Sequence, residues 1–157
     1  MSNTNYTKAL PWDDRWNEPT LDQLIEPIEE NFRGMYVRLL EGLKEIEGVE
    51  WAIKWHGPGW RWSVQVTLGS PKSEDSPVMC YLVPYPERPV YTIPLSDDTI
   101  ASLPKKRLSK YIRDGIRSAK WSVDIFWATW SPATDNEINF LLDLLKRKHA
   151  HLTSEEE

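Results

Sequence analysis

WAIKWHGPGWRWSVQVTL, residues 51–68, carries the strongest secondary-structure signal in the chain. It contains two runs in which large apolar and polar residues alternate, and Gly57-Pro58-Gly59 separates them. Alternation with a period of two is typical of a strand that is buried on one face only. Proline presets φ at the second position of a type II turn, and glycine accepts the positive φ of the third. The stretch therefore predicts a β-hairpin with a tight turn.

Each strand of this predicted hairpin has one apolar face. The apolar positions are Trp51, Ile53, Trp55, Trp60, Trp62, Val64, Val66 and Leu68. Four of the nine tryptophans lie here, and a fully buried apolar side chain stabilises a fold by roughly 1.5–3 kcal/mol. We therefore expect this face to form the centre of the core, beneath helices. The alternative is that the indoles form an aromatic platform for a ligand.

Length and composition limit the class of protein. The chain has 157 residues, of which 27% are charged and 40% hydrophobic, and this is typical of one soluble globular domain. Its net charge of -5 argues against nucleic acid as a partner. No apolar run approaches the ~20 residues of a membrane span, and the N-terminus has no hydrophobic signal core, so we expect a cytoplasmic protein without a membrane partner. We expect a loose arm over residues 1–18, which the indole of Trp12, of Trp16 or of both can pin, one domain over 19–150 and a polar tail over 151–157.

The rest of the chain predicts helices and three further strands. A capping box at Thr20 opens a short helix, and an amphipathic helix follows to about Ile46. After the hairpin we expect strands at 78–83, 90–95 and 121–128, helices at 97–102 and from Pro104, and a final helix after Thr134. The order αα-ββββ-αα-β-α predicts an α+β fold in which an about five-stranded, largely antiparallel sheet packs against helices.

This order of elements resembles the small bacterial YdhG-like domains of unknown function. The shared features are the helical start, the Trp-bearing strand at 51–55, the glycine turn into an aromatic strand, the apolar strand at 78–83, and the basic helix after Pro104 followed by a last strand and helix. The resemblance covers roughly residues 20–150. It implies a compact α+β fold, and it carries no assigned activity and no catalytic residues.

The polar face of the hairpin is the first candidate site. The candidate ligand-binding residues are Lys54, His56, Arg61, Gln65 and Tyr81. If helices cover the opposite face, these side chains form a shallow cationic and aromatic groove, suited to a small anionic ligand or an acidic peptide. The alternative interpretation is a solvated sheet face, on which mixed charges are usual.

A basic segment is the second candidate. Seven positive charges lie between Lys105 and Lys120, and the predicted helix patch comprises Lys106, Lys110, Arg113 and Arg117. Such a patch can bind phosphate or an acidic protein partner. The alternative is a solvated helix face whose long side chains lie over apolar neighbours.

Catalytic, cofactor and metal motifs are not found in the sequence. A Cys-His-Asp set of Cys80, His56 and Asp124 can be imagined, although a single cysteine in an apolar strand is usually a small buried hydrophobe. We therefore predict no catalytic residue, no cofactor and no metal.

These observations predict a non-catalytic binding or interaction module that uses an open sheet face. The alternative is a small enzyme or ligand-handling protein with a cationic, aromatic pocket for an anionic small molecule. Trp127 and Trp130 are candidates for an apolar patch through which two copies form a homodimer, and burial in the core is the alternative for them.

Overall fold

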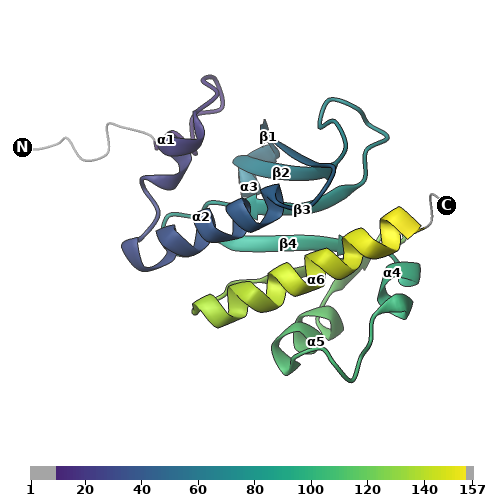
Figure 1. Cartoon of the computed structure of the whole chain (residues 1–157). Coiled ribbons are helices and arrows are strands. Elements are labelled where there is room, and N and C mark those ends of the chain that lie inside the picture. Colours follow the sequence, from purple (N-terminus) through teal and green to yellow (C-terminus); the bar gives the residue numbers. More distant parts are fainter. Residues whose placement is uncertain (1–9, 155–157) are drawn as a thin grey trace, which may run out of the picture.

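The computed structural model describes residues 10–154 and shows one antiparallel sheet with helices packed against it (Figure 1). Within that range the sheet has six strands in the order β1-β2-β3-β4-β6-β5. The strands are β1 (Val49–Trp55), β2 (Trp62–Leu68), β3 (Val78–Val83), β4 (Val90–Leu95), β5 (Lys120–Ser122) and β6 (Ile125–Trp130). The predicted α+β class with a largely antiparallel sheet is confirmed.

Three longer and three shorter helices complete the described part of the chain. They are α1 (Leu21–Ile25), α2 (Glu30–Lys44), α3 (Gly57–Trp60), α4 (Asp97–Ser102), α5 (Lys110–Arg117) and α6 (Asp135–Ser154). The predicted capping box begins α1, since Thr20 Oγ1 accepts from the Gln23 backbone N–H and the Gln23 side chain accepts from the Thr20 N–H. In residues 10–154 no helix is long and apolar enough to cross a membrane.

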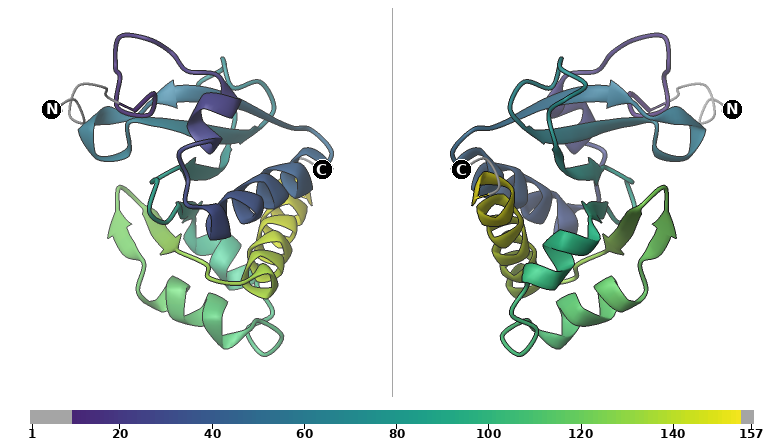
Figure 2. Two further views of the ribbon diagram at one scale, coloured as in Figure 1. Left: turned by 90° about the vertical axis from the view of Figure 1, so that its left-hand side faces the viewer. Right: turned by 90° about the vertical axis from the view of Figure 1, so that its right-hand side faces the viewer.

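Strand register separates the core from the open face of the sheet. Val64 is opposite Leu82 and Val66 is opposite Cys80, so these four side chains share one face, and all are fully buried. Helices α2 and α6 cover that face side by side (Figures 1 and 2). The Tyr36 hydroxyl on α2 donates to the Leu82 carbonyl at 2.9 Å, which ties the helix layer to the sheet.

The hairpin turn differs from the predicted type II turn. One helical turn, α3, connects the strands; Gly57 has φ +88° and Arg61, which follows it, has φ 58°. Pairing begins at Trp55 and Trp62, so Trp60 and Arg61 lie outside the strand. The prediction that Trp60 shares the core face with Trp62 is therefore wrong, because α3 interrupts the alternation.

The predicted strand at 121–128 is a hairpin of two strands. Val123 and Asp124 have φ 52° and 63°, and two consecutive positive φ values reverse the chain in a two-residue turn. The sheet therefore has six strands where about five were predicted. A β-branched residue strongly disfavours positive φ, so Val123 gave no sign of a turn in the sequence.

The segment that precedes α1 packs against the hairpin. Trp12 is buried, its indole N–H donates to the Trp60 carbonyl at 2.8 Å, and the Trp62 indole N–H donates to the Asp14 carbonyl at 2.6 Å. Of the two indoles expected to pin the arm, Trp12 anchors residues 10–18 and Trp16 is exposed. Residues 1–9 of the arm lie outside the described range. Residues 151–154 of the expected tail form the last turn of α6, and 155–157 lie outside the described range.

A close approach between α5 and β6 fixes the position of the basic helix. Gly115 faces the Trp130 indole, whose N–H donates to the Tyr111 carbonyl at 3.1 Å. A Cβ at position 115 would overlap that ring. Trp130 is buried in the core, so only Trp127 of the two predicted patch residues remains on the surface.

We expect Gly115→Ala to reduce the free energy of unfolding by about 1–3 kcal/mol, because the added methyl group forces the indole or α5 to move. Gly34→Ala is the matched control, since nothing lies within 4 Å of a Cβ at this position in α2. It should stabilise the protein by about 0.5–1 kcal/mol through the reduced entropy of the unfolded chain. Urea denaturation measures both, and equal effects of the two substitutions would contradict the close packing of α5.

Candidate functional site

Aromatic side chains gather on the open face of the sheet around Tyr81. Its ring centroid lies 5.3 Å from that of His56, 5.0 Å from that of Trp60 and 6.2 Å from that of Trp127. All four side chains are half-buried. We refer to His56, Trp60, Tyr81 and Trp127 as the open-face cluster.

The strand register explains why these residues meet. Tyr81 is opposite Gln65 on one side and Thr92 on the other, and Thr92 is opposite Thr129. These positions have the opposite parity from the core residues of the same strands, so they form a row across the face away from α2 and α6. His56 and Trp60 join that row from the two ends of α3.

His56 contacts the side chain of Gln65 in the same row. Its Nε2 lies 3.2 Å from Gln65 Oε1, and its Nδ1 is buried with no hydrogen-bond partner among residues 10–154. Burial lowers the pKa of His56, the Lys54 charge acts in the same direction, and the hydrogen bond to Gln65 opposes them. Backbone hydrogen bonds with Lys54 and Arg61 also oppose the lowering of this pKa.

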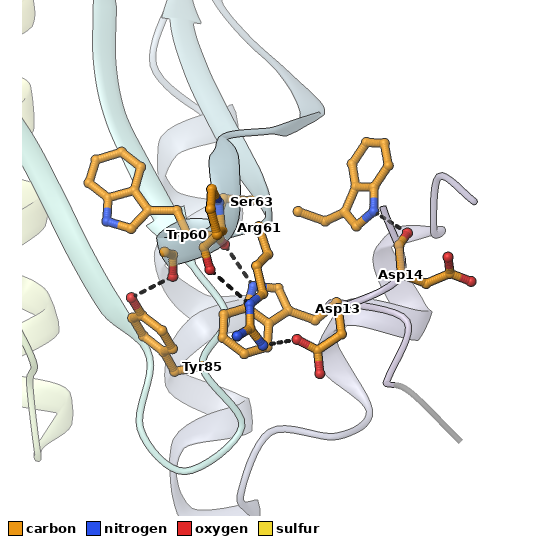
Figure 3. Close-up of polar contacts among 10 residues, drawn as sticks. Asp13, Asp14, Trp60, Arg61, Ser63 and Tyr85 are labelled. Atoms are coloured by element: carbon orange, nitrogen blue, oxygen red, sulfur yellow. Dashed lines mark hydrogen bonds and ion pairs between the residues drawn. The ribbon is translucent and has the colours of Figure 1, made fainter. Parts of the chain in front are cut away.

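Two of the predicted ligand-binding residues point away from the cluster. Lys54 Nζ donates to the Pro71 carbonyl at 2.5 Å. Arg61 pairs with Asp13, and its guanidinium lies 4.6 Å from the centre of the Trp12 ring (Figure 3). The structure therefore brings together His56, Gln65 and Tyr81, whereas Lys54 and Arg61 hold neighbouring loops.

A pocket of about 290 Å³ adjoins the open-face cluster. Tyr81 and Trp127 form its wall on the sheet side, and Thr99, Lys148 and Leu152 approach from α4 and α6. It lies where the pairing of β3 with β4 ends, because the ladder between these strands stops at Tyr81 and Thr92. The cluster and the pocket thus form one continuous surface.

Lys148 bridges the place where β3 and β4 separate. Its buried ammonium donates to the carbonyls of Val78 at 2.6 Å, Met79 at 3.1 Å and Pro94 at 2.5 Å. Pro94 has no N–H to offer β3, so the lysine supplies the donor that the ladder lacks. One side chain of α6 therefore joins two strands.

The surroundings of Lys148 are unusual for a charged group. Burial lowers its pKa to about 7, while the weaker influence of Cys80 acts in the opposite direction. The three carbonyl contacts also favour the ammonium, because they satisfy its three donors. Within residues 10–154 it makes no ion pair with a carboxylate, although buried lysines are normally paired.

Sequence reasoning did not select Lys148, although a signal was present. The apolar face of the last helix includes Ile138, Leu141 and Leu145, and Lys148 and Leu152 continue it at steps of three and four. A lysine on the same helix face as buried leucines must either extend its ammonium to water or donate to hydrogen-bond acceptors in the protein interior. The acceptors come from β3 and β4, which no local pattern could identify.

The basic patch does not form one helix face. Lys106 precedes α5, which begins only at Lys110. Lys110 and Arg117 both contact Asp114, at 3.1 and 3.5 Å, and all three side chains are exposed. Such exposed pairs contribute about 0–1 kcal/mol, so the segment resembles the solvated face that was the alternative prediction.

Cys80, His56 and Asp124 do not assemble into a nucleophilic set. Cys80 is fully buried on the helix-covered face, and burial raises the pKa of its thiol to about 12. His56 lies on the other face, and Asp124 is in the turn between β5 and β6. In the described part of the chain, no three His, Cys, Asp or Glu side chains are grouped to hold a metal ion.

No family model, no curated protein and no solved structure matches this chain. The resemblance to YdhG-like domains therefore stays a prediction.

We expect Lys148→Met to destabilise the protein by about 2–4 kcal/mol near pH 7, because three buried carbonyls lose their donor. The loss should grow as the pH rises from 7 to 9.5. The pKa of Lys148 is about 7 in the folded protein and 10.5 in the unfolded chain. Between these values the unfolded chain binds more protons than the folded protein, so the free energy of unfolding of the wild type rises with pH. Urea denaturation at several pH values measures both effects.

Lys146→Met is the matched control, since it removes one charge from an exposed position of the same helix. It should leave the pH profile of the wild type unchanged. If the profiles of wild type and Lys148→Met run parallel between pH 7 and 9.5, Lys148 does not titrate there and the prediction is wrong.

Proposed function

We propose that the protein is a binding module that holds a small ligand on the open face of its sheet, over the open-face cluster. The observation that carries this proposal is the grouping of three half-buried aromatic rings around the ring of Tyr81, next to a pocket. Aromatic side chains bring a large contact area with little loss of conformational freedom. Three separate parts of the chain contribute them, so the grouping depends on the fold.

The geometry of the rings favours a small ligand. The Tyr81 ring is inclined by 33° to Trp127 and by 83° to His56. Tyr81 and Trp127 also line the pocket of about 290 Å³ beside the cluster, so these two rings border a concave surface. Binding sites for small molecules are concave and mainly apolar, with a few polar groups that set orientation.

Polar side chains border the cluster in the same row of the sheet. Gln65 holds His56 at 3.2 Å, and the hydroxyl oxygens of Thr92 and Thr129 lie 3.2 Å apart. These groups supply orientation, and the rings supply most of the contact area.

Fragment binding followed by amide chemical shifts in NMR spectra tests this proposal. We expect fragments with an aromatic or aliphatic body to shift the amide signals of Gln65, Tyr81, Thr92 and Thr129. Trp127→Ala should weaken their binding about tenfold, because it removes one wall of the hollow. Trp16→Ala is the control, since Trp16 is 84% exposed and is outside the cluster.

Two results would contradict the proposal. Shifts confined to the hairpin of β5 and β6, where Val123 is 88% exposed, would indicate a protein contact instead. Equal effects of Trp127→Ala and Trp16→Ala would show that the cluster takes no part in binding.

A further inference from the structure

We infer that the ligand is a small organic anion, whose acidic group lies in the pocket beside Lys148 and whose apolar body lies against Tyr81 and Trp127. This inference rests on the proposed function and adds the class of ligand. It differs from the site expected from the sequence, in which Lys54 and Arg61 supplied the positive charge.

The first step is the position of Lys148. It lines the pocket together with Tyr81 and Trp127, although α6 packs on the other face of the sheet. This is possible because β3 and β4 are not paired beyond Tyr81 and Thr92. The pocket therefore joins a buried cation of the helix layer to the aromatic rings of the open face.

The second step is the balance of charge. The carbonyls of Val78, Met79 and Pro94 satisfy the three protons of the ammonium, but they do not neutralise its charge. A buried charge without a counter-ion is costly, and interactions between charges are strong where water is excluded. An anion in the pocket supplies the counter-ion that residues 10–154 do not provide.

The third step concerns the rest of the wall. Pro94, Ile125 and Leu152 are apolar, and the Ser96 and Thr99 hydroxyls lie 3.0 Å apart at the edge near α4. No Asp or Glu is among the lining residues of this pocket, so nothing there repels an acid. The volume of about 290 Å³ lies just below the usual range for ligand sites, roughly 300–1,000 Å³, and suits a compact amphipathic acid.

A matched pair of probes tests the inference on the wild-type protein. 3-Phenylpropionate and its neutral amide, 3-phenylpropionamide, have nearly the same shape and differ in charge. We expect the carboxylate to bind about tenfold more tightly than the amide at pH 6, as measured by NMR titration. Both probes should shift the amide signals of Tyr81 and Trp127.

Variants then assign the preference to one residue. Lys148→Met should lower the affinity for the carboxylate to that for the amide, and should leave the affinity for the amide almost unchanged. Lys146→Met should keep the preference of the wild type, because this lysine is exposed on the same helix. If Lys148→Met does not fold, the comparison of the two probes on the wild-type protein decides alone.

The outcomes separate this inference from the proposed function. If the wild type binds the two probes with equal affinity and the signals of Tyr81 and Trp127 shift, the inference of an anionic ligand is wrong. The proposal that the open face binds a small ligand then still stands. A preference for the carboxylate that survives in folded Lys148→Met would also overturn the role of this lysine. Shifts elsewhere, or no binding of either probe at millimolar concentration, would overturn both proposals.

Discussion

The contact of one ammonium with three carbonyls completes the junction between β3 and β4 where their direct pairing ends. Lys148 reaches Val78 and Met79 on β3 and Pro94 on β4, at the place where these strands no longer pair. In a strand, the N–H and C=O of one residue point to the same side. The Pro94 carbonyl faces β3, and proline has no N–H on that side to donate to β3. A buried carbonyl without a donor costs about 1–3 kcal/mol. Regular pairing could not continue past this proline, and α6 supplies the missing hydrogen bonds.

A different set of contacts holds α3, the helical turn that joins β1 and β2. The Trp12 indole N–H donates to the Trp60 carbonyl, and Arg61 lies over the Trp12 ring. Arg61 also pairs with Asp13 (Figure 3). Tyr85 adds a hydrogen bond to the Gly59 carbonyl at 3.0 Å. These contacts hold α3, and α3 in turn sets the place of Trp60 beside Tyr81. The aromatic side of the candidate site thus depends on a segment that lies about fifty residues earlier in the sequence.

The parts of the sheet with regular alternation of apolar and polar residues could be predicted from the sequence. The parts in which a turn interrupts the alternation could not. The faces of β2 and the start of α1 follow from local patterns, since each rests on neighbours in sequence. Trp60 and Arg61 were misplaced because α3 shifts the parity by a helical turn. Of the candidate site, His56 and Gln65 could be predicted from parity, whereas strand 78–83 is apolar on both parities and left Tyr81 and Cys80 as alternatives. Lys148 could not, because its acceptors are 54 to 70 residues away in the chain.

A charge placed for structural reasons can also serve recognition, provided that the structure leaves it without a counter-ion. The Lys148 side chain must be a donor to complete the sheet, and burial then lowers its pKa toward 7. An apolar residue could not donate, and a pairing carboxylate would have to occupy the pocket that Tyr81 and Trp127 border. The same gap between β3 and β4 therefore explains why the lysine is needed and why a pocket exists beside it, and it is the basis of our proposal that the pocket binds an anion.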